Sequence, residues 1–214
     1  CGRPSDENAH PFIDCTGRIS IVHNGIIENY MHLKEGLLKE GHRFTSQTDT
    51  EVLVHLVEKY YKDDLMDAVR SALNEIKGTY AMAAVVQGSD QIVAARKENP
   101  LVVGVGVNEN FISSDVTALL NYTNKVKYVM EGEIVSLTPR SIVIWDGNGD
   151  VVEREVQTVN WNAEDAQKGG FPHFMLKEIF EEPQAIHNSL LGALDLIENG
   201  DILPNVQFNS VKII

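Results

Sequence analysis

Residues 19–30, with the sequence ISIVHNGIIENY, decide how the first part of the chain is interpreted, because an apolar run there ends on Asn24-Gly25 and more apolar residues follow. Asn-Gly between two apolar runs is the commonest short signal for a β-hairpin turn. The later apolar positions are spaced three and four residues apart, which suits a helix and not a returning strand; they are Ile26, Ile27, Tyr30, Leu33, Leu37 and Leu38. The pattern predicts a strand, a turn at Asn24-Gly25 and a helix from about Ile26 to Glu40, which Gly41 ends as a C-cap.

The junction at Asn24-Gly25 is a candidate for chemistry. In a turn between strand and helix, the Asn24 side-chain amide and the Gly25 backbone N–H can point the same way. Two converging donors are what a developing oxyanion needs. Glycine also lets a ligand approach the backbone closely. Asn24 and Gly25 are therefore candidate oxyanion-hole residues.

Composition and charge limit the classes of partner. The chain has 214 residues, 43% of them hydrophobic, which is enough for one sizeable domain and an appendage. Its formal net charge of −13 argues against nucleic acid or a membrane surface as partners, because both demand clustered Lys and Arg. No apolar run is long enough for a signal peptide or a membrane span, and Cys1 and Cys15 make no disulfide framework. We therefore expect a cytoplasmic protein.

The sequence predicts no metal site and no cofactor. None of the seven histidines forms a metal-ligand spacing with a cysteine or an acid. Cys15 lies in a turn before a strand and is expected to be an inert thiol.

Two further helices are predicted in the first third of the chain. Thr48-Asp49-Thr50-Glu51 has the form of a capping box, and the apolar positions from Val52 to Tyr60 that follow it indicate a helix. Another helix is predicted from Asp64 to Lys77, with Gly78 closing it.

From Thr79 the chain consists of short β-rich runs, interrupted by one helical piece around Val116–Leu120. The runs are Tyr80–Val86, Ile92–Ala95, Leu101–Val107, Phe111–Ser113, Val126–Met130, Glu133–Leu137, Ser141–Trp145 and Val151–Glu155. Asp146-Gly147-Asn148-Gly149 is predicted to be a hairpin turn. Consecutive antiparallel strands and separate helices indicate an α+β fold rather than alternating βαβ units. A polar run, Asn160–Gly170, then suits a linker before helical stretches at Phe174–Glu181 and Pro183–Glu198.

Several separated motifs together resemble the glutamine amidotransferase half of the glucosamine-6-phosphate synthase family, the isomerizing glutamine:fructose-6-phosphate aminotransferases. The run VHNGIIEN at 22–29 is the strongest of them. The others are Gly2-Arg3-Pro4-Ser5 through Asn8-Ala9-His10-Pro11, Thr48-Asp49-Thr50-Glu51-Val52, Ser114-Asp115 with Ala118-Leu119-Leu120, and His173 through Lys177-Glu178-Ile179 to Pro183. They occur in the family's order and span most of the chain.

The resemblance implies a fold and a division into domains. The family's glutaminase domain is an N-terminal-nucleophile hydrolase, a four-layer αββα sandwich with two antiparallel sheets between helical layers. We expect such a sandwich, incomplete at the N-terminus, over residues 1–159. Residues 160–204 would be the linker and helices that lead to a sugar isomerase domain, and residues 205–214 would begin the first strand of that domain.

The resemblance also implies an activity and site residues. In the family, a cysteine attacks the side-chain amide of glutamine, a thioester forms, and the released ammonia is used to convert fructose 6-phosphate to glucosamine 6-phosphate. Asn24 and Gly25 match the oxyanion hole, Asp49 matches the carboxylate that holds the α-ammonium group of glutamine, and His10 and Thr48 match pocket residues. Fructose 6-phosphate would bind in the full-length enzyme, expected to be a homodimer.

Two interpretations of Cys1 remain open. An N-terminal cysteine would offer a thiol beside an α-amine that can serve as its base, which favours a nucleophile. In register with the family, however, Cys1 falls where a Thr-His-Gly turn is usual, and Cys1-Gly2 runs directly into the Gly-Arg-Pro-Ser loop. This register indicates that the chain begins inside the domain, without the opening strands, and that it hydrolyses no glutamine at an enzyme-like rate.

The sequence therefore supports two functions of different classes. One is a glutamine-hydrolysing domain that supplies ammonia for amino-sugar synthesis. The other is a catalytically incomplete fragment that retains part of a glutamine pocket. An amidotransferase of purine or asparagine synthesis is a less favoured third alternative, because the helices after the domain match the sugar-synthase linker.

Overall fold

The computed structural model describes residues 2–160, 171–173, 175–183 and 186. The chain divides into two compact units, Cys1–Trp161 and Asn162–Ile214. The division of residues 1–159, 160–204 and 205–214 into domains stays a prediction, and the last of these ranges lies outside the described residues. Among the described residues, no helix is both long and apolar enough to cross a membrane.

A seven-stranded antiparallel sheet forms the centre of the first unit, with the order β1-β2-β3-β4-β8-β9-β10. Its strands are β1 (Phe12–Ile13), β2 (Ile19–Ile27), β3 (Gly78–Val86), β4 (Ile92–Lys97), β8 (Ile134–Leu137), β9 (Ile142–Trp145) and β10 (Val151–Val152). The turn between β9 and β10 confirms the hairpin predicted at Asp146–Gly149, since Gly149 N donates to Asp146 O. β2 and β3 pair over their full length from Ile19↔Val86 to Ile27↔Gly78.

A second antiparallel sheet of four strands has the order β11-β7-β5-β6. Its strands are β5 (Val102–Val105), β6 (Asn110–Ser113), β7 (Lys125–Tyr128) and β11 (Gln157–Thr158). A 3₁₀ turn, η2 (Val116–Leu119), follows β6, and another, η1 (Asp6–Asn8), precedes β1. Residues 102, 116, 119, 126 and 159 form a small core between this sheet and η2.

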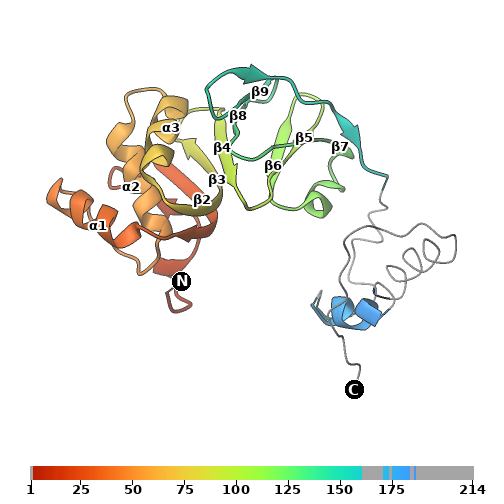
Figure 1. Cartoon of the computed structure of the whole chain (residues 1–214), viewed down its shortest axis with the longest axis horizontal. Helices are drawn as coiled ribbons and strands as arrows, with labels where there is room; N and C mark the ends of the chain where they lie inside the picture. Colours follow the sequence, from red (N-terminus) through yellow and green to blue (C-terminus); the bar gives the residue numbers. More distant parts are fainter. Residues whose placement is uncertain (1, 161–170, 174, 184–185, 187–214) are drawn as a thin grey trace, which may run out of the picture. The chain divides into compact units, whose positions relative to one another are not determined.

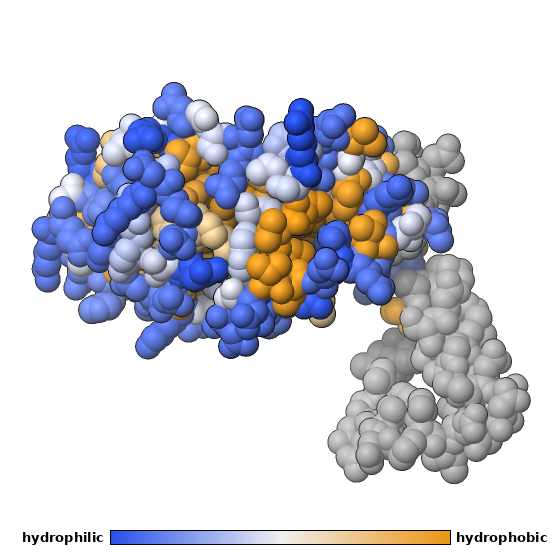
Figure 2. Space-filling view, turned by 90° about the horizontal axis from the view of Figure 1, so that it is seen from above, coloured by the Kyte–Doolittle hydropathy of each residue, from blue (hydrophilic) through white to orange (hydrophobic). Residues whose placement is uncertain are grey.

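Three helices cover one face of the large sheet, and the small sheet lies on the other side (Figure 1). They are α1 (Tyr30–Lys39), α2 (Thr50–Tyr60) and α3 (Leu65–Glu75). Successive side chains of β3 point to opposite faces of the sheet, because side chains alternate along a strand. Met82 and Ala84 belong to the core beneath the helices, whereas Ala81 belongs to the core between the sheets. Seen from above, the helical layer presents mainly hydrophilic surface and the apolar surface gathers over the sheets (Figure 2).

The expected α+β class is confirmed, and the predicted helices and strands are found with shifted ends. α3 begins where predicted: Asp64 is its N-cap and accepts from Asp67 N. Residues 175–183 are helical, which confirms the first helix of the second unit; Pro183, expected to begin the next helix, belongs to the same run. Most of the stretch Pro183–Glu198 lies outside the described residues.

The turn predicted at Asn24-Gly25 is wrong. β2 continues through both residues to Ile27, and α1 begins at Tyr30 instead of Ile26. The reason is β3, which pairs with this segment residue by residue and satisfies its backbone groups in a ladder. Ile27 is buried as a strand residue, and Ile26 is 65% exposed rather than on the inner face of a helix.

The capping box predicted at Thr48–Glu51 is also absent. Asp49 is the N-cap of α2, and its side chain makes no capping hydrogen bond. The Glu51 carboxylate reaches further back than a capping box allows, because it accepts from Thr45 N at 2.6 Å and from Ser46 N at 2.7 Å. Gly41, by contrast, ends α1 as predicted, with a φ of +99°.

Candidate active site

Asn24 and Gly25 lie in the exposed part of β2, opposite Ala81 and Tyr80 of β3. Gly25 has a φ of +135°, and a Cβ atom there would lie 2.1 Å from Thr79 O. A glycine is therefore required, both by the backbone conformation and by the closeness of β3.

The backbone of Asn24 is held by a residue from another loop. Asn99, between β4 and β5, donates from Nδ2 to Asn24 O at 2.9 Å. The Asn24 side-chain amide makes no hydrogen bond with any residue in the described part of the chain, and it faces a cavity. Its N–H groups are thus available to a ligand.

That cavity has a volume of about 350 Å³ and lies between the two sheets. Its lining includes the polar residues His10, His23, Asn24, Ser113 and Ser114, and the apolar residues Val22, Ala81, Met82, Ala83, Leu101 and Ile112. The volume is within the range of small-molecule sites, and an apolar wall with a few polar groups is typical of them. Of the predicted site residues, the cavity brings together Asn24 and His10.

Neither Asp49 nor Thr48 is in the wall of this cavity, although the charge of Asp49 acts on both of its histidines. Asp49 Oδ2 accepts from Ile27 N at 2.7 Å, so the carboxylate is joined to the end of β2. Thr48 is buried, and its Oγ1 lies 2.9 Å from Ser46 Oγ. Gly25 is absent from the cavity wall as well. The roles predicted for these three residues stay predictions.

Two histidines face the cavity, and both are held toward the neutral form. Burial lowers the pKa of His23, while its contact with Thr79 O and the Asp49 carboxylate oppose the shift. Burial also lowers the pKa of His10, opposed by the negative charge of Asp49. Both ring nitrogens of His23 already face protein oxygens. The acceptor nitrogen of a neutral His10 is therefore the one that can receive a proton from a ligand.

His23, Asn99 and Thr79 are residues of this region that the sequence did not single out. His23 Nδ1 lies 3.0 Å from Thr50 Oγ1, and its Nε2 lies 3.4 Å from Thr79 O, so the ring links β2 to both α2 and β3. The signal for His23 was its place directly before Asn24 in an alternating strand. Asn99 and Thr79 carried no signal, because their contact with β2 depends on strand pairing. Cys1 lies outside the described residues.

A family profile described as "Glutamine amidotransferase domain" matches residues 3–121, which is more than half of the chain. The chain belongs to this family. The match contains Asn24 and Asp49 and the first, helical half of the fold.

Curated relatives extend the likeness along the chain. A glutamine–fructose-6-phosphate aminotransferase [isomerizing] of Thermus thermophilus is 51% identical over 193 residues, covering 90% of this chain and 32% of the relative. The enzyme of the same name from Methanothermobacter thermautotrophicus is 52% identical, and the match covers 88% of this chain and 32% of the relative. The one from Aquifex aeolicus is 47% identical, and the match covers 90% of this chain and 33% of the relative. The chain therefore spans about a third of the length of the curated relatives it matches.

Solved structures show the same fold. Glutamine phosphoribosylpyrophosphate amidotransferase from B. subtilis is 24% identical, with a TM-score of 0.58. The match covers 69% of this chain and 33% of that chain. An allosteric regulatory enzyme of purine biosynthesis is 25% identical with a TM-score of 0.56, over 66% of this chain and 31% of that one. These are N-terminal-nucleophile hydrolases, so the expected fold is confirmed.

Proposed function

We propose that this chain is the glutamine-hydrolysing part of a glutamine–fructose-6-phosphate aminotransferase, which supplies ammonia for glucosamine 6-phosphate. The observation that carries the proposal is the side-chain amide of Asn24, which faces a 350 Å³ cavity without a partner among the described residues. The name and the roughly 50% identity of the curated relatives support the substrate.

The proposed chemistry is acyl transfer. Glutamine would lie with its side-chain carbonyl toward Asn24 and Gly25, whose N–H groups would stabilise the negative oxygen of the tetrahedral intermediate. Asp49 would hold the α-ammonium group by a charge-assisted hydrogen bond, beside its contact with Ile27 N. His10 would complete the pocket, and Thr48 would fix the loop that carries Asp49. The attacking group would be a cysteine thiol, for which Cys1 is the candidate in the sequence; the thioester that forms would release ammonia and then be hydrolysed by water.

The alternative is a catalytically incomplete fragment. It would bind glutamine through the same residues and release no ammonia. Calorimetric titration of the purified chain with glutamine, together with an ammonia assay, separates the two functions. Binding with ammonia release supports the first, and binding without ammonia release supports the second. Absence of binding to the chain and to the protein encoded by its whole gene would contradict both.

Replacing Asn24 tests the oxyanion assignment. In the protein encoded by the whole gene, Asn24→Ala should lower kcat for ammonia release by about 10²–10³, the usual cost of one lost oxyanion donor, with little change in KM. Asn121→Ala, at an exposed residue outside the cavity, is the matched control and should keep wild-type activity. Unchanged kcat in Asn24→Ala would refute the assignment.

Partners and compartment belong to the same proposal. Fructose 6-phosphate would be bound by the part of the enzyme beyond this chain, and the whole enzyme would be a homodimer. A cytoplasmic location is proposed because Cys15 is a free thiol, as is usual in reducing compartments.

A further inference from the structure

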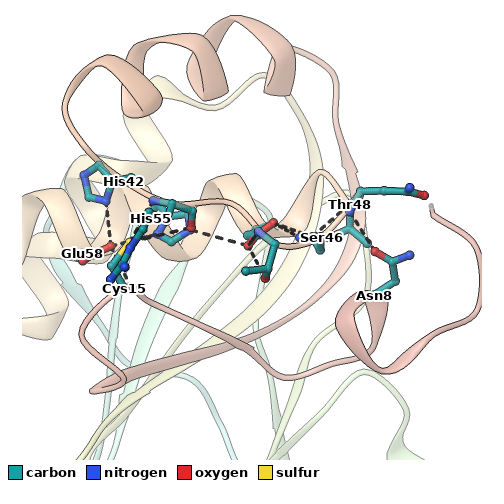
Figure 3. Close-up of polar contacts among 11 residues, drawn as sticks. Asn8, Cys15, His42, Ser46, Thr48, His55 and Glu58 are labelled. Carbon is teal, nitrogen blue, oxygen red and sulfur yellow. Dashed lines mark hydrogen bonds and ion pairs between the residues drawn. The ribbon is translucent and has the colours of Figure 1, made fainter.

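Four residues with metal-ligating side chains converge where the β1–β2 loop and the end of α1 meet α2 (Figure 3). They are Cys15, His42, His55 and Glu58, and their ligand atoms all lie within 4.8 Å of one another. Cys15 lies between β1 and β2, His42 follows α1, and the other two residues lie on α2. None of them lines the cavity that holds Asn24.

The local structure fixes each of the four side chains. His55 and Glu58 are three residues apart on α2 and so share one face of the helix. His42 is placed by the end of α1, where its N–H donates to Leu37 O at 3.0 Å after the left-handed Gly41. Cys15 Sγ accepts from Arg43 N at 3.2 Å. The cluster is thus held by the backbone rather than by mobile surface groups.

The distances suit a four-coordinate ion. Cys15 Sγ lies 3.6 Å from His55 Nδ1, and a tetrahedral Zn²⁺ with ordinary Zn–S and Zn–N bonds would separate these atoms by about 3.6 Å. Glu58 Oε2 lies 2.8 Å from His42 Nδ1 and 2.9 Å from His55 Nδ1, which are hydrogen-bond lengths. A bound ion would open these two contacts by about 0.5 Å to the tetrahedral edge.

The far nitrogen of His55 is the observation that favours a metal over a simple hydrogen-bonded cluster. The side chain of His55 is 1% exposed, and its Nε2 has no hydrogen-bond partner in the described part of the chain. If Nδ1 carries the proton toward Glu58, the Nε2 lone pair faces Glu51 Oε1 at 3.9 Å, and two acceptors oppose each other. With a metal on Nδ1, the proton is on Nε2 and points at that carboxylate, the usual arrangement behind a metal-bound histidine.

Hydrogen-bond partners surround the carboxylates of Glu58 and Glu51. Burial raises the pKa of Glu58, but hydrogen bonds from His55, His42 and Cys15 N outweigh it and lower the pKa. Burial also raises the pKa of Glu51, and donors from Thr45 and Ser46 outweigh it in the same way.

We propose that Cys15, His42, His55 and Glu58 bind one Zn²⁺ ion in a closed structural site. The thiol of Cys15 gives up its proton to solvent, both imidazoles move their protons from Nδ1 to Nε2, and Glu58 binds as the carboxylate; no oxidation or reduction occurs. The site ties the β1–β2 loop and the end of α1 to α2. Through Glu51 it also supports the loop at Thr45 and Ser46 that leads to Asp49 (Figure 3).

Zinc content tests the proposal directly. The purified chain is stripped with a chelator, reloaded with Zn²⁺ alone, freed of excess metal and analysed by plasma mass spectrometry. About one Zn²⁺ per chain is expected, with a melting temperature that rises with zinc concentration. Cys15→Ser and His42→Ala should each lose most of the bound zinc. His32→Ala, at an exposed histidine of α1 outside the cluster, is the matched control and should bind as the wild type does.

Two further measurements keep the test independent of folding defects. Cobalt loaded in place of zinc should give a thiolate-to-metal absorption band that Cys15→Ser lacks, while circular dichroism shows the variant folded. Glu51→Gln removes the carboxylate behind His55 and should weaken zinc binding by about 10–100-fold. Absence of stoichiometric zinc in the wild type, or equal zinc in wild type and Cys15→Ser, would overturn the proposal.

Discussion

Gly25 shows how closely β2 and β3 approach each other at the candidate site. We expect Gly25→Ala to lower the free energy of unfolding by about 3 kcal/mol, because the new methyl group meets Thr79 O at 2.1 Å and the φ of +135° is strained for alanine. Urea denaturation measures the change.

Gly17→Ala is the matched control for that substitution. Gly17 also has a left-handed φ, of +75°, but a Cβ atom there meets nothing within 4 Å. The control should therefore cost only about 1 kcal/mol, from the backbone conformation alone. Equal losses in the two variants would show that β3 can move away from Gly25.

His23 makes stability depend on pH. Burial lowers the pKa of His23 below its ordinary value of 6.5, so between the two pKa values the unfolded chain binds more protons than the folded one. The free energy of unfolding should then rise with pH in this window. The stabilisation that comes from neutral His23 is present above pH 6.5 and is lost as the pH falls toward the lowered pKa.

Replacing His23 removes that dependence. Urea denaturation of the wild type and of His23→Gln at about pH 7.5 and about pH 5.5 should show a smaller pH effect in the variant, because glutamine does not titrate. An identical difference between the two pH values in both proteins would mean that other groups cause it.

The sequence directs attention to the Asn24-Gly25 segment but predicts the wrong local structure for it. The resemblance supplies Asn24, His10 and Asp49 as candidates, and the structure places the first two at one cavity. A turn is predicted at the Asn-Gly pair because its nearest neighbours in sequence suit one. Its conformation is decided instead by β3, about fifty residues further on, which no local pattern reveals.

At the scale of elements, α1 contains a glycine in its interior. A Cβ atom at Gly36 meets nothing within 4 Å, and its φ is not left-handed. We expect Gly36→Ala to raise the free energy of unfolding by about 0.5–1 kcal/mol, because alanine loses less backbone entropy in a helix. Thermal and urea denaturation would detect the gain. Destabilisation instead would indicate that α1 needs flexibility at this residue.

Helices with a clear apolar stripe could be predicted, whereas two of the two-residue strands could not; the third, β10, was found within the longer run predicted at Val151–Glu155. The predicted starts of α2 and α3 agree with the structure to within two residues. β1 and β11 were missed, since two residues are too few to show alternation and both strands owe their existence to a neighbour. The capping box was wrong because the carboxylate of Glu51 is buried among donors from the preceding loop.

At the scale of the whole molecule, both sites are assembled from segments that are distant in sequence. The cavity takes residues from the loop after η1 and from β2, β3 and β6, and the proposed zinc cluster joins the β1–β2 loop to α2. The sequence analysis found no metal-ligand spacing, and His55 and Glu58, three residues apart on α2, were overlooked. The other two ligands, Cys15 and His42, are too distant in sequence for a spacing rule to find them. The α+β class, which depends on the succession of elements, was accessible from the sequence.

The three helices lie between β2 and β3 in the sequence, so pairing the two strands closes a long loop that contains all three. This connectivity sets an order of folding events. Ile27 pairs with Gly78, and α1, α2 and α3 all lie between them. Closing an unstructured loop of roughly 50 residues costs about 3.5 kcal/mol in chain entropy, whereas helices form within about a microsecond.

We therefore expect the helices to shorten the loop first and the ladder to close afterwards as the slow step. Pulsed hydrogen exchange during refolding should protect amides of α2 and α3 before those of Val22 to Ile27. Simultaneous protection from the earliest time, or strands before helices, would reverse this order. The central strand of the candidate site would then be among the last parts of the domain to become native, and catalysis could begin only when folding is nearly complete.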